Sequence, residues 1–407
     1  MNNNKVVVNN REHIMKRLLN FTIAGMMLAS PAISGGWEAG RLDSSFMYQE
    51  GSYAEVGTSS IDYDVKGKTQ ANKTHKMAKD QTRTSLAFKM EYGDFDIGLT
   101  RYMSGAIQLD GQNTAATLTP PGCNPLVNPN PANAAVAQVG YCSIVPSADV
   151  TAHSIALLGK YSINDNISVL GGINRYDVET STVTTIAGHY VVSGDEMAPV
   201  VGAAYENKEI ALRVELMVQA ETDMTLSAAS SVAAAVPTTA LTGAKLVIPQ
   251  TMTLNFQSGI AKDTLLFGSV HKADWKTAQI AIPANTAGVN PVTGALDQAV
   301  TNVGSDFANR TAYSIGVGRK LSDSISVLGS YATEGGGGAT STDPFTLTDG
   351  SQTIALGARY TYENMTVSGG YSYTKVGDVK MTHATGLSSD YKDNKVTGFG
   401  LKIGFSF

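Results

Sequence analysis

The polar side chains that could do chemistry in this sequence are few and scattered. Beyond residue 34 there are five histidines, and they stand at His75, His153, His189, His271 and His383. None of them lies at a spacing from serine or a carboxylate that is typical of a nucleophile and its base, and the sequence has no metal-binding or phosphate-binding motif. These patterns argue against catalysis, so we expect neither enzymatic activity nor a cofactor.

A different chemistry is indicated where polar residues alternate with apolar ones. In residues 210–219, Arg213, Glu215 and Met217 fall on one side of a predicted strand, and the other side is apolar. An arginine there could pair with the carboxylate of a ligand, or it could belong to an internal Arg/Glu lattice that stiffens a wall. Further arginines considered for the same lining are Arg101, Arg175, Arg319 and Arg359.

A second patterned stretch, residues 264–273, carries Phe267 and His271 on the same side. If His271 faces the interior, Phe267 lines an apolar pocket beside it. Both sides of this stretch are partly apolar, which a water-filled pore would rarely need. The two residues are therefore candidates for contact with an apolar ligand.

The elements that must position these residues are β-strands. Period-two alternation and frequent Tyr, Val and Ile residues predict fourteen of them. The predicted strands cover residues 53–65, 83–92, 95–104, 153–162, 167–176, 197–205, 210–221, 251–257, 264–273, 311–320, 324–331, 353–362, 365–373 and 396–407.

The connections between the predicted strands alternate without exception between short turns and long loops. The short ones, such as residues 92–94 and 164–166, consist of turn-forming Gly, Asn and Asp residues. An up-and-down meander of this kind is typical of a transmembrane antiparallel β-barrel, with short turns in the periplasm and long loops outside. The fold class expected is therefore all-β, with long extracellular loops.

The last stretch, residues 395–407, shows the pattern most clearly. Phe399, Leu401, Ile403 and Phe405 share one side, while glycines and Lys402 occupy the other. The apolar side must be shielded from water, and we expect the lipids of the outer membrane to shield it. The final residue, Phe407, resembles the terminal aromatic residue that the outer-membrane barrel assembly machinery reads, so we expect it to act as an assembly signal.

The N-terminus has the features of a secretory signal. Lys16 and Arg17 precede an apolar stretch and a small-residue cleavage pattern, so we expect residues 1–34 to be removed, with residues 1–14 an upstream extension. Residues 35–52 are then a short plug segment, and residues 53–407 are the barrel. The plug residues expected to pack inside the barrel are Trp37, Arg41, Phe46 and Tyr48.

Composition and cysteine usage set further bounds. The net charge of −5 and the lack of a Lys/Arg-rich run with interleaved aromatics argue against binding to nucleic acid. Cys123 and Cys142 are the only cysteines, and in an exported protein we expect them to form a disulfide that staples one long loop.

Several stretches resemble the outer-membrane long-chain fatty acid transporter family, the FadL type. The resemblance is carried by residues 200–227, 251–275 with its LLFGSV run, 313–328, and 354–407 with its NMTVSGGYSY hairpin. It implies a fourteen-stranded barrel with a pathway for hydrophobic ligands. Only residues 35–52 are expected between the signal and the first strand, and they contain neither a hatch of that family's length nor its Asn-Pro-Ala motif. For the kinked third strand of the family, the sequence offers Gly98 and residues 103–105.

The long loops contain apolar stretches suited to capturing a hydrophobic ligand, or to packing on one another above the barrel. They are residues 115–118, 126–127, 232–236 and 246–248. The function expected is passive transport of long-chain fatty acids or other hydrophobic compounds, including hydrocarbons, across the bacterial outer membrane. The alternatives are a porin-like channel for polar solutes and a surface adhesin or receptor.

Overall fold

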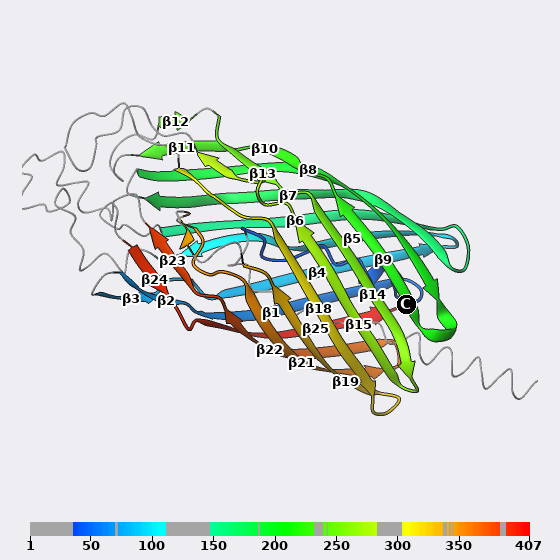
Figure 1. Cartoon of the computed structure of the whole chain (residues 1–407). Helices are drawn as coiled ribbons and strands as arrows, with labels where there is room; N and C mark the ends of the chain where they lie inside the picture. The colour runs from blue at the N-terminus through cyan, green and yellow to red at the C-terminus, as the bar shows by residue number, and fades with distance from the viewer. Residues whose placement is uncertain are drawn as a thin grey trace, which may run out of the picture.

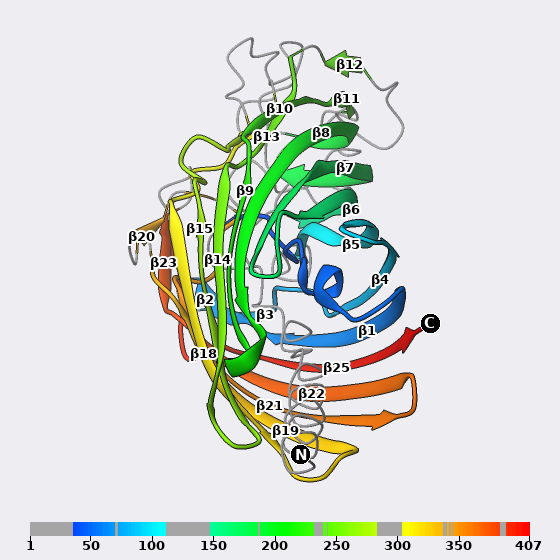
Figure 2. The same cartoon turned by 90° about the vertical axis from the view of Figure 1, so that its right-hand side faces the viewer.

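Fourteen antiparallel strands form a closed barrel in the computed structural model (Figures 1 and 2). Because β25 pairs with both β22 and β1, the ring has no free edge. This confirms the predicted fold. The strands are β1 (Tyr53–Asp64), β4 (Gln81–Tyr92), β5 (Phe95–Leu109), β6 (Ser147–Ser162), β7 (Ile167–Thr185), β8 (Gly188–Asn207), β9 (Leu212–Gln219), β14 (Thr251–Ala261), β15 (Thr264–Ala273), β18 (Arg310–Lys320), β19 (Ile325–Glu334), β21 (Ser351–Tyr362), β22 (Met365–Val376) and β25 (Lys395–Ser406).

The structure describes most of the chain beyond residue 35. The described residues are 36–69, 72–110, 147–185, 188–231, 239–241, 243–282, 303–336, 340–341, 343, 345–382 and 388–407. Among them, no helix is both long enough and apolar enough to cross a membrane.

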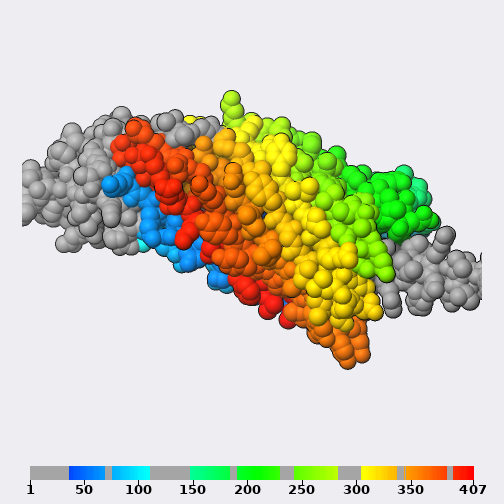
Figure 3. Space-filling view, turned by 60° about the horizontal axis from the view of Figure 1, so that its bottom comes forward, coloured from blue at the N-terminus to red at the C-terminus, as the bar shows by residue number. Residues whose placement is uncertain are grey.

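The outward face of the barrel is apolar across its middle. In β25, Phe399 is 58% exposed and Phe405 is 44% exposed, whereas the inward-facing Lys402 is 7% exposed. The same alternation runs through the neighbouring strands, which cross the surface as diagonal bands (Figure 3). An outward apolar band of this kind is covered by lipid in membrane barrels, so the barrel spans a bilayer.

The strands differ in length, and the longest ones carry the outer part of the molecule. Strands β5 to β8 have 15 to 20 residues, whereas β9 has 8. The pairings within this group shift register at three places, which lie in one row because Gly105 is opposite Ala152 and Ala152 is opposite Val178. Such irregularities increase local twist, and here they occur toward the loop ends of the strands.

Small sheets cover the loop end of the barrel. One contains β2 (Lys66–Thr69), β3 (Asn72–Lys76), β20 (Thr340–Ser341), β23 (Val379–Thr382) and β24 (Ser388–Tyr391). Another contains β10 (Thr222–Thr225), β13 (Lys245–Ile248), β16 (Ile280–Ile282) and β17 (Val303–Gly304). In addition, β11 (Ser227–Ser231) pairs with the outer part of β8, and β12 (Thr239–Leu241) pairs with β11.

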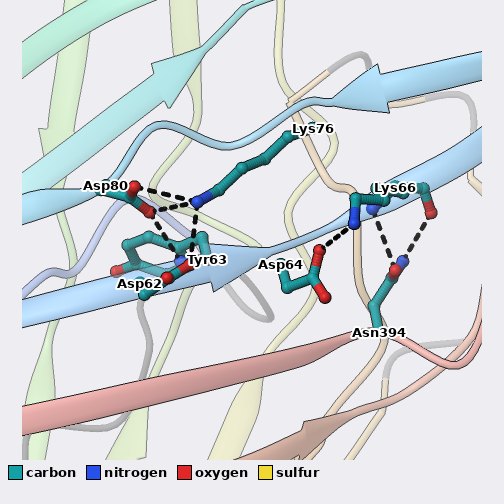
Figure 4. Close-up of polar contacts among 7 residues, drawn as sticks. All are labelled: Asp62, Tyr63, Asp64, Lys66, Lys76, Asp80 and Asn394. Atoms are coloured by element: carbon teal, nitrogen blue, oxygen red, sulfur yellow. Dashed lines mark hydrogen bonds and ion pairs between the residues drawn. The ribbon is translucent and has the colours of Figure 1, made fainter.

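Side chains at the end of β1 fasten the first of these sheets to the barrel (Figure 4). The Lys76 ammonium lies 2.8 Å from Asp62 Oδ1 and 2.7 Å from Asp80 Oδ1. The Asn394 amide accepts from the backbone N–H of Lys66 and donates to its carbonyl, both at 2.9 Å, as a neighbouring strand would. These contacts hold β2 above the barrel wall.

Candidate functional site

The N-terminal segment, residues 36–52, lies inside the barrel, where Figure 2 shows it in dark blue within the ring of strands. Its middle forms a short 3-10 helix, η2 (Ser45–Tyr48). All four residues expected to pack inside lie against the wall: Trp37 beside Tyr176, Arg41 beside Glu334, Phe46 beside Gly98 and Tyr48 beside Arg213.

The first part of this segment docks on β5 through backbone hydrogen bonds. The N–H of Ala39 donates to the Ser104 carbonyl at 2.8 Å, and the N–H of Ala106 donates to the Trp37 carbonyl at 2.7 Å. The Trp37 ring lies on Gly105, where a Cβ atom would collide with it. The register shift beside Gly105 matches the place where the family resemblance puts a kink, but its inner side is occupied by the N-terminal segment.

Farther along β5, Gly98 gives space to the second part of the segment. A Cβ atom there would collide with the Met47 sulfur and lie 2.6 Å from the Phe46 ring. The two glycines of β5 that the sequence offered for a kink are thus the places where the aromatic residues of the segment approach the wall. The segment therefore runs along β5 from Gly105 at Trp37 to Gly98 at Phe46.

Two buried lysines satisfy the carbonyls at the end of η2. The Lys160 ammonium donates to the Met47 carbonyl at 3.0 Å, and the Lys89 ammonium donates to the Gln49 carbonyl at 2.6 Å. Asp96 lies 2.7 Å from Lys160 and 3.6 Å from Lys89. The last carbonyls of a helical turn have no hydrogen-bond partner within the turn. The two lysines provide the missing donors, and in doing so they also hold the segment against the wall.

Charged side chains of the segment pair with the wall between its two apolar ends. Glu38 lies 2.9 Å from Arg41 Nε and 3.4 Å from His271 Nε2, and Arg41 lies 3.7 Å from Glu334. Thr253 Oγ1 lies 2.8 Å from His271 Nδ1 and fixes the ring. Although burial raises the pKa of Glu38, the charges of His271 and Arg41 outweigh it and lower that pKa to about 2.

Arg213 and Tyr48 form the contact that fixes the end of the segment. The guanidinium carbon of Arg213 lies 4.2 Å from the centre of the Tyr48 ring, within the range of a cation–π contact. The neighbouring inward residue, Glu215, accepts a hydrogen bond from Ser44 Oγ at 2.5 Å. The candidate Arg213 thus serves the N-terminal segment in this state of the protein, rather than pointing into open space.

An apolar cluster fills the outer half of the interior. Its centre is a series of edge-on ring contacts, with ring centres 6.1 Å apart for Trp37 and Tyr176, 6.1 Å for Trp37 and Trp275, and 5.8 Å for Trp275 and Phe307. Leu246 and Ile248 of β13 belong to it, so this apolar stretch is buried rather than displayed. We call this set the outer apolar cluster.

A second, smaller apolar cluster surrounds η2. Phe46 and Met47 pack there against Leu158, Leu170 and Val200, and Met217 lies in the same group. The polar residues Glu38, Arg41 and Asp43 lie between the two clusters along the segment. The interior therefore presents apolar surface, then paired charges, then apolar surface again.

Four candidate ligand-binding residues face the interior, as expected: Arg213, Met217, Phe267 and His271. Glu215 and Met217 are buried on the inner side of β9 with Arg213 in the same alternation, and His271 is 4% exposed. Phe267 shares its side of β15 with His271, and its ring lies over Gly316 of the adjacent strand. Contact of these residues with a ligand remains a prediction.

The prediction that Arg101 and Arg175 line the interior is wrong. Thr100 and Tyr102 are the buried neighbours in β5, so Arg101 shares the outward side with Leu99. Arg175 likewise points outward. It lies 3.4 Å from Asp177 and 3.2 Å from Asp195 at the outer limit of the apolar band, where a long side chain can extend its charge away from lipid.

Sequence reasoning missed several residues that hold the N-terminal segment. Lys89, Lys160 and Arg83 are buried on the inward side, and Arg83 donates to the Ala39 carbonyl. For Lys160 the available signal was a single cation within an inward side of otherwise small or apolar residues. Arg83 and Lys89 share the inward side of β4 with Gln81 and Glu91, so no such signal marked them. Of two further arginines considered, Arg359 faces inward and Arg319 outward.

Some predictions fall outside the described residues. They are the signal peptide (residues 1–34), the disulfide between Cys123 and Cys142, and three apolar loop stretches at residues 115–118, 126–127 and 232–236. Phe407 is described: its N–H donates to the Ser52 carbonyl at 2.9 Å, and its ring lies 6.1 Å from that of Phe88. Its role as an assembly signal remains a prediction.

We compared the sequence and the fold with those of known proteins. No family model matches the sequence, and no curated protein matches it. A FadL homologue from Pseudomonas aeruginosa is similar in structure, with a TM-score of 0.62, 12% identity, and 89% of this chain and 92% of that chain covered.

Two toluene transporters have similar structures. They are TodX of Pseudomonas putida, with a TM-score of 0.60 and 11% identity, and TbuX of Ralstonia pickettii, with 0.57 and 9%. Each comparison covers 95% of this chain and 98% of the other. This chain therefore has the fold of the FadL-type outer-membrane channels, in agreement with the resemblance seen in its sequence.

Proposed function

We propose that this protein is a passive outer-membrane transporter for hydrophobic compounds, with long-chain fatty acids and hydrocarbons as its substrates. The observation that carries the proposal is the division of the barrel interior. The outer apolar cluster offers a binding surface below the loops, and the N-terminal segment with its paired charges closes the passage beneath it. An apolar molecule gains free energy on reaching such a cluster, whereas a hydrated solute does not.

The polar edge of the outer apolar cluster favours the binding of amphiphilic ligands. Trp37 Nε1 is buried there without a hydrogen-bond partner among the described residues, whereas His271 Nε2 already faces Glu38 at 3.4 Å. A buried donor such as the Trp37 N–H favours a ligand that brings a polar acceptor to it, as a carboxylate does. The FadL homologue and the toluene transporters share the fold, and the names of TodX and TbuX agree with an apolar cargo.

Ligand binding by the purified protein tests the proposal. Delipidated protein should bind oleic acid and toluene saturably, and mass spectrometry should find hydrophobic compounds that purify with it. Retained binding in a variant that lacks residues 36–52 would show that the barrel alone forms the site. No saturable binding of any apolar compound would contradict the proposal.

Electrical measurements separate this function from that of a channel for polar solutes. With the N-terminal segment docked, the barrel should pass little steady ion current in a planar bilayer. Deletion of residues 36–52 should raise the conductance. A large constant current through the intact protein would instead favour a channel for polar solutes, because it requires a continuous water-filled passage.

A further inference from the structure

Two lysines stand directly opposite each other on the outward side of the barrel wall. Lys375 of β22 is paired with Lys395 of β25, and both side chains are exposed. The residues beside them, Thr374, Val376 and Val396, are buried on the inward side. Because side chains alternate along a strand, the two lysines point away from the lumen. We call these two residues the lysine pair.

Directly opposed like charges are unfavourable in a sheet. Residues in this relationship place their Cβ atoms about 5 Å apart, so the two ammonium groups repel each other. An anion between them replaces that repulsion with two attractions. Lysine binds phosphate in this way, as a compact charge with three hydrogen-bond donors. The lysine pair is therefore suited to an anion that has several acceptor oxygens.

The acidic residues nearby do not supply that anion. Asp64 of β1 is opposite Lys395 on its other side, but the Asp64 carboxylate lies 2.5 Å from Lys66 Nζ (Figure 4). Asp378 and Asp393 lie beyond the loop ends of the two strands, where the N–H of Asp393 donates to the Asp378 carboxylate at 3.0 Å. Among the described residues, no carboxylate forms an ion pair with either member of the lysine pair.

The other outward cations of the barrel are arranged differently. Lys272, Arg101 and Arg319 each have uncharged residues opposite them on both sides. Arg175 is held by two aspartates. In the described part of the fourteen-strand ladder, the lysine pair is thus the place where two outward cations meet without an acid between them.

The lysine pair stands at the outer edge of the lipid-facing surface. On its side toward the short turns, Tyr371, Tyr373 and Phe399 are exposed on the same outward face. Tyrosine is enriched where hydrocarbon meets lipid headgroups. The long loops of a barrel of this kind lie outside the cell. The ammonium groups therefore lie at the level of the headgroups in the outer leaflet, above an apolar surface that suits acyl chains.

We propose that the lysine pair binds a phosphate group of lipid A, the phosphorylated glycolipid of the outer leaflet, with acyl chains against Phe399 and a sugar beside Tyr373. A phosphate monoester carries about 1.5 to 2 negative charges at neutral pH, which matches two ammonium groups. The phosphodiester of an ordinary phospholipid carries a single charge. This inference goes beyond the proposed function and requires only that the barrel lies in the outer membrane.

Native mass spectrometry of the purified full chain in detergent tests the proposal. The protein is titrated with diphosphoryl lipid A, and the bound fraction is measured for the parent and for Lys375→Gln/Lys395→Gln. The parent should retain lipid A, and the glutamine variant should bind it about tenfold to thirtyfold more weakly, given what basic residues contribute near anionic lipid. Lys375→Arg/Lys395→Arg keeps both charges and should bind like the parent.

The matched control removes two lysines at the opposite rim. Lys208 and Lys262 are exposed at the short-turn end of the barrel, so Lys208→Gln/Lys262→Gln changes the net charge equally. This control should bind lipid A like the parent. Lipid A from which both phosphates have been removed should bind every form weakly and to the same extent, because its acyl chains and sugars are unchanged.

The assignment is overturned if the glutamine variant and the control bind lipid A alike, whether both keep the parent affinity or both lose it. It is also overturned if the parent retains no lipid A, or if it binds dephosphorylated lipid A or phosphatidylglycerol as tightly as lipid A. Heat-modified migration in gels shows in each case that the barrel is folded. Binding of oleic acid by the same preparations reports separately on the proposed function.

Discussion

The Trp37 ring lies directly over Gly105, and this contact sets how the N-terminal segment meets the wall. The position has no room for a Cβ atom, since one would enter the Trp37 ring. The variant Gly105→Val should therefore displace the ring and destabilise the docked segment by about 1–3 kcal/mol, the usual effect of overpacking. The measurements are tryptophan emission, which should shift to longer wavelength, and conductance, which should rise.

Gly171 provides the matched control for this variant. It is also a strand glycine of the barrel, and a Cβ there would meet nothing within 4 Å. Gly171→Val should leave emission and conductance unchanged. Equal effects of the two substitutions would mean that Gly105 matters for the strand itself and not for the contact with Trp37.

The contact between Arg213 and Tyr48 leads to a second prediction. Arg213→Met keeps an apolar stem but removes the charge above the ring, so the segment should lose about 1–2 kcal/mol of docking free energy. Protease cleavage within residues 36–52 should become faster, while the barrel remains intact. Arg319→Met, on the outward side, is the control and should be cleaved like the parent protein. Unchanged cleavage of Arg213→Met would contradict the assigned contact.

Glu38 gives the docked segment a defined pH dependence. Its pKa of about 2 is below the ordinary value of 4.5, so its contribution is complete above about pH 4.5 and is lost as the pH falls toward 2. The expected contribution is on the order of 2–3 kcal/mol. Release of the segment, followed by protease cleavage, should increase over this range in the parent protein.

The variant Glu38→Gln isolates that effect from other carboxylates. It should dock more weakly at pH 7, and the difference from the parent protein should shrink as the pH falls below 4.5. A difference that stays constant between pH 7 and pH 3 would show that the ion pairs of Glu38 with Arg41 and His271 do not hold the segment.

The outward orientation of Arg101 and Arg175 makes a negative prediction. Arg101→Ala and Arg175→Ala should bind apolar ligands with the affinity of the parent protein. His271→Ala, by contrast, removes an inward residue at the edge of the outer apolar cluster and should weaken binding of oleic acid severalfold. Loss of binding in either arginine variant would contradict the strand alternation described above.

The strand number and the turns could be predicted from the sequence because lipid and tight turns impose strong local rules. Short turns fix where two strands begin, and Thr264–Ala273 was predicted with its exact bounds. The loop ends were missed: the strand predicted to end at residue 176 continues to Thr185. Beyond the lipid band the strands are covered by other loops, so the alternation that marks a lipid-facing strand no longer applies.

The site could be predicted only in part. Arg213, Met217 and His271 stand in strands with one clearly apolar side, so their inward orientation was readable. Arg101 and Arg175 stand on the apolar sides of their strands, with Leu99 and Ile173 respectively, so the alternation already indicated the outward orientation that the structure shows. The partners of the N-terminal segment depend on contacts between residues far apart in sequence, such as Lys160 with Met47, which no local pattern encodes.

The most direct test of the account is uptake. Radiolabelled oleic acid and toluene are offered separately to bacterial cells that lack an outer-membrane channel of this kind and to the same cells expressing this protein. The account predicts faster accumulation of at least one of the two compounds when the protein is present, with no change in the uptake of a polar sugar. Equal rates for both apolar compounds with and without the protein would contradict it.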